Sequence, residues 1–370
     1  MTYNPKPANN LRVLQLIDSL EAGGAERMAV NLANALVGNV EFSGLVATRR
    51  EGDLKHSISP QVNYLFLDRK KRIDFNALVR LRNFAEQHSI TIVHAHATSF
   101  FMAFLLKLLK PGLKVIWHDH YGESEHLEAR PYKFIRLACL SFSHIISVNP
   151  DLKQWARDKL KFSKVSFVRN FTQSSRIPED RVTCLGKASE EVKIVQIANF
   201  RPQKAHSTAF EAMRILKEQG FRVSLHCIGA YSEKDPYVKS LESYIVDNKL
   251  SDVIKLYGSR SDISFILEQA DIGLLSSRSE GLPLSLLEYT QAKLPVVVTD
   301  VGQCAEVVGE FGQVVKPDNA KALAEAIAFY IKNKAIAQNH ARALHIKMKK
   351  EFDSERIISE IIAIYKAALK

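Results

Sequence analysis

Residues 276–308 read SSRSEGLPLSLLEYTQAKLPVVVTDVGQCAEVV, and this stretch decides the fold. A short apolar run precedes it at residues 271–275, and a second apolar run occupies residues 295–299. Continuous apolar runs of this length are typical of strands that are buried in a parallel sheet. Between the two runs lie a loop of small and acidic residues and then a helical pattern. The order of strand, loop, helix and strand therefore predicts a parallel α/β unit.

Two glutamates in this stretch, Glu280 and Glu288, stand eight positions apart and bracket Gly281-Leu282-Pro283. A glycine-containing loop that opens a helix presents free N–H groups and the positive end of a helix dipole, which suit a phosphate. Carboxylates nearby accept strong hydrogen bonds from sugar hydroxyls. A nucleotide-sugar needs both kinds of group. A buried loop with Glu288 on a solvated helix face is an alternative that fits the same spacing.

The alternation of strand and helix continues on both sides of this stretch, which predicts parallel sheets with helices on both faces. Strands are expected at residues 11–17, 41–47, 62–66, 91–94, 114–117, 144–148, 164–168, 192–198, 222–228, 253–257, 272–275, 295–299 and 312–315. Helices are expected at residues 25–36, 75–88, 98–109, 132–141, 151–160, 206–218, 237–248, 263–268, 284–292, 319–333, 334–350 and 354–369. The pattern breaks at residues 172–191, which are polar and predict a linker.

The fold class expected from this pattern is α/β, with two doubly wound, Rossmann-like domains that face a cleft. The length of 370 residues agrees with two domains, each large enough for its own core. Two common nucleotide signatures, G-x-G-x-x-G after the first strand and G-x-x-x-x-G-K-[ST], are missing from the sequence. A conventional dinucleotide or P-loop site is therefore not supported.

The formal net charge of +11 favours an anionic partner: nucleic acid, an acidic membrane surface or a phosphorylated substrate. Nucleic acid is excluded as the weakest of these, because the sequence has neither an arginine–aromatic repeat nor a helix-turn-helix pattern. The basic run at residues 69–72 is interpreted as a solvated loop, with contact to an anionic membrane as the alternative.

The four cysteines, Cys139, Cys184, Cys227 and Cys304, are scattered without a C-x-x-C pair, which predicts a reducing, cytoplasmic location. The first ten residues have no apolar core and do not resemble a signal peptide. The longest apolar run, residues 100–106, is too short to span a bilayer. We therefore expect a cytoplasmic protein, at most peripheral at the inner face of the membrane.

A second polar segment follows the first strand of the second half and contains Asn199, Arg201 and Lys204. An arginine and a lysine three positions apart, after a strand and before a helix, can converge on phosphate oxygens. Together with a helix N-terminus they would stabilise the charge that grows on a departing diphosphate. The sequence has no Asp-x-Asp motif that would hold Mg²⁺ or Mn²⁺ there, so no metal or other cofactor is expected. Two solvated loop cations are the alternative.

Polar residues also end a strand of the first half, in His118-Asp119-His120. The carboxyl end of a parallel strand is a common ligand position, so a histidine here is a candidate for contact with a sugar hydroxyl. A metal site formed by His118 and His120 with His94 and His96 is a weaker alternative, because no carboxylate or cysteine stands at ligand spacing. Gly23-Gly24, after the first strand, allows close approach of the backbone to a ligand, or is simply a strand-to-helix turn.

The stretch from Glu280 to Tyr289 resembles the retaining glycosyltransferases of family 4, whose signature is Glu, seven residues and Glu, followed by a Pro-Val-Val strand. In that family the first glutamate lies beside the donor sugar and the second holds the ribose. The resemblance implies donor contacts from Glu280, Glu288 and the backbone of Gly281, Leu282, Pro283 and Leu284. Two departures are visible: Pro283 has no N–H to offer a phosphate, and Tyr289 replaces the usual alanine.

Other segments match the family as well. The segment from Asn199 resembles a Gly-Arg-Leu-x-x-x-Lys-Gly motif, although it is two residues shorter, and this implies that Arg201 and Lys204 hold the donor diphosphate. The loop of Gly23 and Gly24 resembles the family's Gly-Gly-Ala-Glu loop. The resemblance further implies a histidine beside the donor sugar, which the alignment assigns to His120 with a shift to His118 open, and a base-reading loop that contains Arg260 and Ser261.

The resemblance implies a retaining, metal-independent glycosyltransferase of GT-B fold, with a nucleotide-sugar donor and a saccharide or lipid-linked saccharide acceptor. The implied domains are an N-terminal acceptor-side domain at residues 1–175, a C-terminal donor-binding domain at residues 190–350, and a helix at residues 351–370 that crosses back to the first. In this scheme Glu280, His120, Arg201 and Lys204 are the catalytic residues. Two rivals are a sugar-nucleotide epimerase of the same architecture and a catalytically silent nucleotide-sugar-binding subunit.

Overall fold

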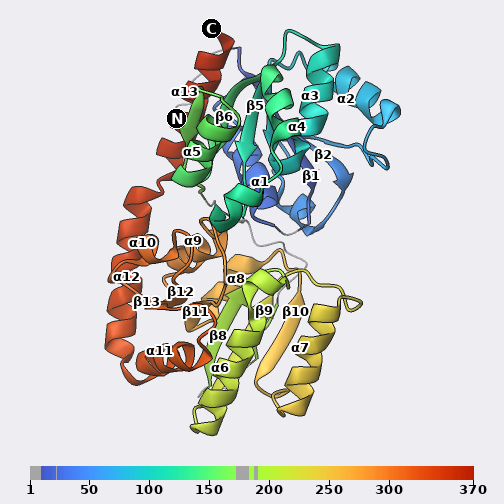
Figure 1. Cartoon of the computed structure of the whole chain (residues 1–370). Coiled ribbons are helices and arrows are strands. Elements are labelled where there is room, and N and C mark those ends of the chain that lie inside the picture. Colours follow the sequence, from blue (N-terminus) through green and yellow to red (C-terminus); the bar gives the residue numbers. More distant parts are fainter. Residues whose placement is uncertain (1–9, 22, 123, 172–182, 187–190) are drawn as a thin grey trace. The chain divides into compact units, whose positions relative to one another are not determined.

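The computed structural model describes residues 10–21, 23–122, 124–171, 183–186 and 191–370 (Figure 1). The chain divides into two compact units, one of Met1–Gln173 with Phe352–Lys370 and the other of Ser174–Glu351. Most of the predicted linker and most of the N-terminal peptide lie outside the described residues. Among the described residues, no helix is both long and apolar enough to cross a bilayer.

The first unit is built on a parallel sheet of seven strands in the order β3-β2-β1-β4-β5-β6-β7. The strands are β1 (Arg12–Ser19), β2 (Phe42–Arg50), β3 (Asn63–Phe66), β4 (Ile92–His96), β5 (Lys114–Asp119), β6 (Phe142–Ser147) and β7 (Val165–Phe167). The helices are α1 (Gly24–Leu36), α2 (Phe75–Gln87), α3 (Phe100–Leu109), α4 (Lys133–Ala138), α5 (Pro150–Lys159) and α13 (Ser354–Leu369).

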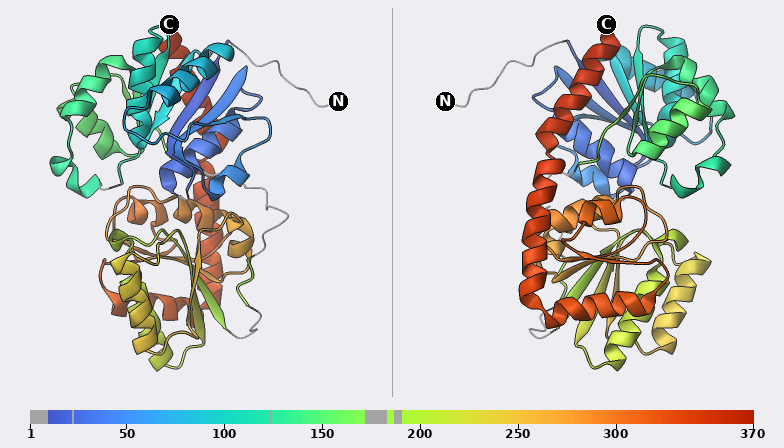
Figure 2. Two further views of the ribbon diagram at one scale, coloured as in Figure 1. Left: turned by 90° about the vertical axis from the view of Figure 1, so that its right-hand side faces the viewer. Right: turned by 60° about the vertical axis from the view of Figure 1, so that its left-hand side comes forward.

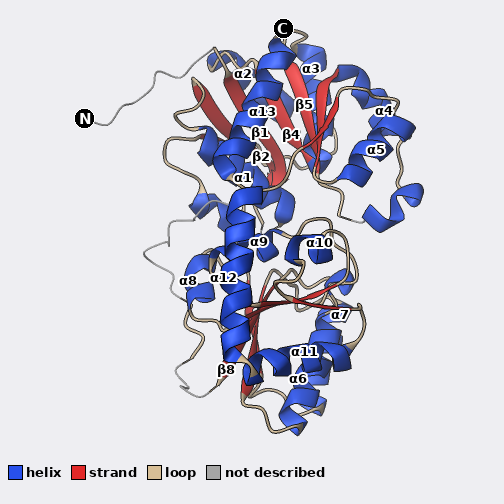
Figure 3. Ribbon diagram, turned by 90° about the vertical axis from the view of Figure 1, so that its left-hand side faces the viewer, coloured by secondary structure: helices blue, strands red, loops and turns tan. Residues whose placement is uncertain are grey.

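Helices cover both faces of this sheet. On one face α1 and the C-terminal helix α13 pack against apolar side chains of β1, β4, β5 and β6, such as Val13, Ile92 and Ile116 (Figure 2). Ile361 and Tyr365 bring α13 into this core, and Figure 3 shows α13 lying along the strands. On the opposite face α2, α3 and α5 pack against alternate residues of the same strands. Burial on both faces explains why these strands are apolar without alternation.

The second unit contains a parallel sheet of six strands in the order β10-β9-β8-β11-β12-β13. Its strands are β8 (Val192–Ile197), β9 (Val223–Ile228), β10 (Ile254–Gly258), β11 (Ile272–Leu275), β12 (Val296–Thr299) and β13 (Gln313–Val315). Its helices are α6 (His206–Glu218), α7 (Pro236–Asp247), α8 (Ile263–Glu268), α9 (Leu284–Gln291), α10 (Cys304–Val308), α11 (Ala320–Lys332) and α12 (Lys334–Glu351). Side chains of α6, α7 and α11 form the core on one face.

The prediction of two doubly wound parallel sheets is confirmed. In each sheet the first strand is flanked by the second and the fourth, so the order reverses between β1 and β4 and again between β8 and β11. Ligands bind at such switch points, at the carboxyl ends of the strands. The five-residue helix α10 was not predicted, because a single helical turn is too short to give a periodic signal.

Tyr289 of α9 occupies space that a glycine leaves open in the sheet. Its ring lies over Gly273 of β11, where an added Cβ would be 2.6 Å from the ring. The buried hydroxyl accepts a hydrogen bond from the Ile197 amide at 2.7 Å and donates one to the Leu274 carbonyl at 3.2 Å. Tyr289 therefore ties α9 to β8 and β11, which accounts for its departure from the family's alanine.

We predict that Gly273→Ala destabilises the protein by about 1–3 kcal/mol, because the new methyl group overpacks the contact with Tyr289. Urea unfolding followed by circular dichroism measures the change. Gly112→Ala is the matched control, because an added Cβ at Gly112 meets nothing within 4 Å. Equal stability of the two variants would contradict the packing described here.

Candidate donor site and histidine cluster

The predicted donor residues gather at the switch point of the second unit. The segment that contains Asn199, Arg201 and Lys204 leaves the carboxyl end of β8, and the segment that contains Glu280 leaves the carboxyl end of β11. These two strands are neighbours in the sheet. Parallel pairing thus brings together two loops that are some 80 positions apart in sequence. The edge of the sheet where they meet is the position at which the sequence analysis predicted a ligand.

An ion pair joins the two loops. Lys204 Nζ lies 2.6 Å from Glu280 Oε1, and Ser277 donates a hydrogen bond of 2.6 Å to the same oxygen. Only 6% of the Glu280 side chain is exposed, whereas 23% of the Lys204 side chain remains accessible. A buried carboxylate needs such charged and polar donors, because burial without them is costly. The pair leaves an accessible ammonium at the edge of the sheet.

Side-chain and backbone hydrogen bonds fix the loop that carries Lys204. Ser276 donates to the Ala205 carbonyl at 3.1 Å and receives a hydrogen bond of 3.0 Å from the Gln196 amide. The Arg278 amide donates to the Gln203 carbonyl at 2.7 Å. Arg278 also pairs with Asp318 on the surface. The Lys204–Glu280 contact is therefore held on a rigid backbone.

A glycine in the turn after β12 lies against the backbone of Glu280. Gly302 has a φ of +52°, and an added Cβ would lie 2.1 Å from the Glu280 carbonyl oxygen. Only glycine tolerates both this conformation and this approach. The next residue, Gln303, donates its amide to the Gly281 carbonyl at 3.0 Å. This glycine was not among the predicted site residues, although it follows the Pro-Val-Val strand at a turn.

The helix α9 begins directly after this loop. Pro283 is its N-cap, with extended backbone angles (φ −70°, ψ 126°) and no side chain that accepts hydrogen bonds. The amides of the first turn, from Leu284 onward, therefore lack a side-chain cap. Leu282 and Leu284 are buried, and Glu288, in the second turn, is half-buried. The arrangement supplies N–H groups and a helix dipole beside the Lys204–Glu280 pair.

The remaining predicted donor residues lie at the same edge of the sheet. Asn199 accepts a hydrogen bond of 2.9 Å from the Ala230 amide, which ties the ends of β8 and β9 together. Arg201 is exposed. Arg260 and Ser261 follow β10; Arg260 is half-buried and donates to the Ser259 carbonyl at 2.8 Å, and Ser261 is buried. A cavity of about 590 Å³ in this unit lies at the opposite edge, near the amino ends of β8 and β11, and contains none of these residues.

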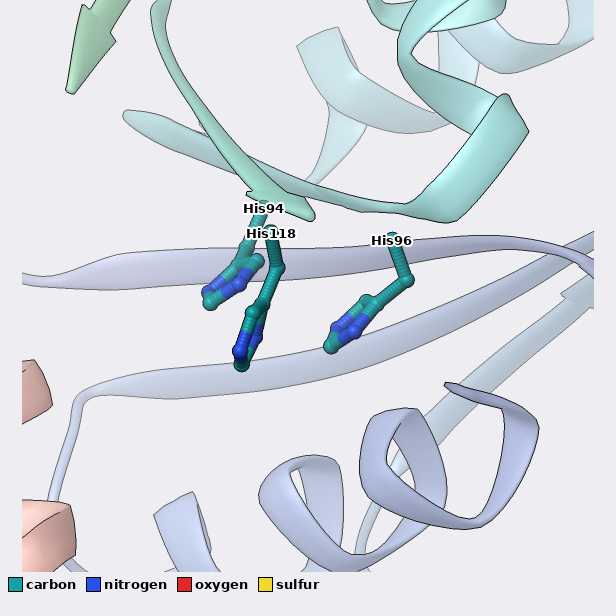
Figure 4. Close-up of side chains that lie close together, drawn as sticks. All are labelled: His94, His96 and His118. Atoms are coloured by element: carbon teal, nitrogen blue, oxygen red, sulfur yellow. The ribbon is translucent and has the colours of Figure 1, made fainter. Parts of the chain in front are cut away.

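In the first unit, the predicted histidines end neighbouring strands. His118 is fully buried on β5, and His120, just beyond the strand, is half-buried. Figure 4 shows His118 with His94 and His96 of β4, all three rings close together. His96 Nδ1 lies 3.0 Å from His120 Nε2. Burial holds the pKa of the three strand histidines well below 6.5 and lowers that of His120 to about 3.

A buried ion pair anchors the segment between the two predicted histidines. Arg130 donates two hydrogen bonds to Asp119, of 2.7 and 2.8 Å, and both side chains are almost fully buried. The guanidinium carbon lies 4.2 Å from the centre of the Trp155 ring and 4.3 Å from that of Tyr121. Sequence reasoning missed Arg130, which stands in no motif and meets Asp119 only through the fold.

The loop of Gly23 and Gly24 caps α1 at the carboxyl end of β1. Gly23 has an extended backbone, and an added Cβ would lie 2.1 Å from a carboxylate oxygen of Glu26. An added Cβ at Gly24 meets nothing within 4 Å. The contact at Gly23 is with the far end of the Glu26 side chain, which can move aside, so the structure gives no firm steric reason for either glycine.

One interpretation of the basic run was wrong. Arg69 is buried rather than solvated, since it lies 3.3 Å from Asp18 and donates to the backbone carbonyl of Arg72 at 2.9 Å. Lys70, Lys71 and Arg72 are exposed as expected. The charges within residues 69–72 do not reveal that Asp18, 51 positions before Arg69, is the ion-pair partner of Arg69.

Two family models match the chain. The model of the glycosyl transferases group 1 matches residues 182–350, and the model of glycosyltransferase family 4 matches residues 22–176. The two matches take in different halves of the chain and together most of its length. The chain therefore belongs to the family 4 glycosyltransferases, and its two parallel-sheet, Rossmann-like domains are those of the GT-B fold.

Individual proteins match the chain over only part of its length or at low sequence identity. Lipopolysaccharide core biosynthesis mannosyltransferase LpcC of Rhizobium leguminosarum is 33% identical over 140 residues, 37% of this chain and 40% of the relative. N,N'-diacetylbacillosaminyl-diphospho-undecaprenol alpha-1,3-N-acetylgalactosaminyltransferase of Campylobacter jejuni is 27% identical over 179 residues, 48% of this chain and 45% of the relative. The matches thus span less than half of each relative. The crystal structure of Anabaena HepE with UDP and glucose has a TM-score of 0.78 at 17% identity, over 97% of this chain and 100% of HepE, and shows the fold.

We predict that Arg130→Met destabilises the first unit by about 3–5 kcal/mol, because it leaves Asp119 buried without its partner. Chemical denaturation provides the measurement. Arg214→Met, which removes an ion pair at the surface, is the matched control and should cause a much smaller loss. A small effect of Arg130→Met would show that Asp119 does not depend on this pair.

Proposed function

We propose that the chain is a metal-independent, retaining glycosyltransferase of the hexosyltransferase class, which transfers a sugar from a nucleotide-sugar to a saccharide or lipid-linked saccharide. The observation that carries the proposal is the accessible ammonium of Lys204, paired with buried Glu280 beside the N-terminus of α9. The activities named for two relatives, in lipopolysaccharide core biosynthesis and on a diphospho-undecaprenol-linked sugar, support a role in the synthesis of lipopolysaccharide or a related surface glycan. We propose that this synthesis takes place in the cytoplasm.

The donor diphosphate would lie between the first turn of α9 and the loop after β8. Lys204 supplies a point charge and the exposed Arg201 a planar fork, and both suit phosphate oxygens. The helix N-terminus adds backbone donors and a favourable dipole. These groups stabilise the charge that develops on the leaving diphosphate, which in other transferases a divalent metal does. Asn199 keeps the loop in place through its contact with Ala230.

The two glutamates have separate roles in this proposal. Glu280, fixed by Lys204 and Ser277, accepts hydrogen bonds from the hydroxyls of the transferred sugar. Glu288, one turn into α9, accepts those of the ribose. Gly281 and Leu282 give the diphosphate a close backbone approach, and Pro283 leaves the amide donation to its neighbours. Arg260 and Ser261, at the end of β10, lie where the base would be read.

In this proposal the first unit contributes the histidines and binds the acceptor. His120, half-buried beyond β5, is the histidine that reaches the donor sugar, and His118 supports it from inside the strand. Gly23 and Gly24 allow a close approach of the backbone to the substrates. In a retaining transfer the acceptor hydroxyl attacks from the face that the diphosphate leaves, and an oxygen of the departing phosphate takes its proton. No protein nucleophile is required.

An exposed apolar surface suggests where a lipid-linked acceptor would meet the chain. Large apolar side chains of α2, α3, α4 and the adjoining turns are exposed; we call them the α2–α4 surface: Ile73, Phe75, Val79, Leu108, Leu109, Phe134, Leu137 and Leu140. Exposed cations border them: Lys70, Lys71, Arg72, Lys133 and Arg136. Apolar side chains with neighbouring cations suit an anionic lipid surface. We propose peripheral contact here with the inner face of the membrane.

We predict that Lys204→Met lowers transfer by about 10²–10³-fold, the usual effect of removing one preorganised donor from developing charge. Glu280→Gln should also lower transfer, because it removes the charge that pairs with Lys204 and accepts hydrogen bonds from the sugar hydroxyls. Glu288→Ala should weaken nucleotide-sugar binding by about 10–100-fold through loss of a charge-assisted hydrogen bond. Calorimetry with a panel of UDP-, GDP- and ADP-sugars measures binding, and radiolabelled donor measures transfer.

Exposed Glu325 and half-buried Lys217, which pairs with Asp252 away from the site, provide the matched controls Glu325→Ala and Lys217→Met. Normal binding and transfer by the three site variants would contradict the site assignment. Incubation of the donor without acceptor separates the rivals: an epimerase converts the sugar, a transferase slowly hydrolyses the donor, and a silent subunit does neither.

We predict that the protein sediments with vesicles that contain phosphatidylglycerol and stays in solution with pure phosphatidylcholine. The double variant Phe75→Ser, Leu140→Ser should lose most of this binding, because it removes the two most exposed apolar side chains of the α2–α4 surface. Val246→Ser, on an exposed apolar residue of the second unit, is the control. Failure of the unmodified protein to sediment would exclude the membrane contact.

A further inference from the structure

Three histidines of the first unit lie on one face of its sheet. His94 and His96 are two positions apart on β4, so their side chains point to the same side. His96 pairs with His118 of β5 across the parallel ladder, which brings the third ring to the same place. Figure 4 shows the three rings gathered together, and their ring nitrogens include one atom each within 4.8 Å of one another.

The hydrogen bonds of two rings place their lone pairs on the opposite ring nitrogens, of which His96 Nδ1 faces His120 Nε2 at 3.0 Å. His94 Nδ1 lies 2.6 Å from the Tyr365 hydroxyl of α13, and His96 Nε2 lies 2.9 Å from Gln15 Oε1. With protons on these two nitrogens, His94 Nε2 and His96 Nδ1 carry the lone pairs. Among the described residues, His94 Nε2 and both nitrogens of His118 have no hydrogen-bond partner, although both side chains are fully buried. Buried polar atoms without partners are rare and call for a ligand or a water.

We propose that His94, His96 and His118 bind a first-row transition-metal ion. The ligand atoms would be His94 Nε2, His96 Nδ1 and a ring nitrogen of His118. Three nitrogens that each lie about 2.1 Å from one ion in a tetrahedral site are about 3.4 Å apart. The ring nitrogens lie within 4.8 Å of one another, so the rings need to close by up to about 1.4 Å. His120 Nε2, 3.0 Å from His96 Nδ1, stands beside the fourth position.

The surroundings match those of metal-binding histidines. Such histidines donate their second ring N–H to an outer acceptor, which fixes the tautomer and the ring orientation. Tyr365 has this role for His94 and Gln15 for His96, and the Gln15 amide in turn contacts the Tyr365 hydroxyl at 3.4 Å.

The ligand chemistry selects the metal. Imidazole without carboxylates suits Zn²⁺, Co²⁺, Ni²⁺ or Cu²⁺, whereas Mg²⁺, Ca²⁺ and Mn²⁺ prefer oxygen ligands. The proposed histidine site is therefore different from a Mg²⁺ or Mn²⁺ site at the donor diphosphate. The proposed function uses no metal ion at the diphosphate. The proposal takes up the weaker alternative from the sequence, because strand pairing places His118 beside His96.

The experiment uses the full chain without an affinity tag, stripped with a chelator and then loaded with Zn²⁺. Metal content after gel filtration should be one ion per chain, and Zn²⁺ should raise the melting temperature. Co²⁺ should give the visible absorption of a tetrahedral site. His94→Ala and His96→Ala should each abolish stoichiometric binding. His226→Ala, which replaces a buried histidine of the second unit, should leave it unchanged.

Tyr365→Phe keeps the fold of α13 but removes the outer partner of His94, so it should weaken metal affinity by about 10–100-fold. Tyr330→Phe is its matched control, because the Tyr330 hydroxyl contacts His340 in the second unit. No stoichiometric ion in the unmodified protein would mean that the cluster holds water and would overturn the proposal. Full binding by the His94 and His96 variants would overturn it as well.

Discussion

Parallel strand pairing is the constraint on which the rest of this structure depends. Parallel strands need long crossovers, so every strand of a sheet ends at the same edge and residues far apart in sequence meet there. In the second unit this constraint brings Lys204 to Glu280 at the switch point between β8 and β11. In the first unit it sets His118 beside His96. The edge of the second sheet thus collects a charged pair, and that of the first collects histidine rings beside the buried ion pair of Asp119 and Arg130.

The donor site combines rigid support with accessible charge. Glu280 is buried and fixed by Lys204 and Ser277, and its backbone is held by the turn at Gly302. Arg201 remains exposed and has the freedom to meet a ligand. A preorganised site of this kind stabilises a developing charge without reorganisation during the reaction. Tyr289 stands at a family position that is usually alanine. Its ring fills the space over Gly273, and its hydroxyl accepts a hydrogen bond from the Ile197 amide, which fixes the helix that begins at the proposed site.

Most of the fold was predictable, because strands buried on both faces give continuous apolar runs and the helices between them have clear periodicity. The convergence of the candidate donor residues at one edge of the sheet was predictable from their places after neighbouring strands; their role in donor binding stays a prediction. Contacts that depend on the pairing of strands and the packing of distant segments were not predictable from the sequence. Neither the Arg130–Asp119 ion pair nor the burial of Arg69 against Asp18 leaves a local signal. The close approach of His118 to His94 and His96 likewise depends on the pairing of β4 with β5.

A crystal structure with a bound nucleotide-sugar tests the central claim most directly. The account predicts pyrophosphate oxygens within hydrogen-bonding distance of Lys204, Arg201 and the first amides of α9, with no metal ion between them. It also predicts the sugar beside Glu280. A donor bound elsewhere, or Lys204 and Arg201 directed away from the pyrophosphate, would contradict it.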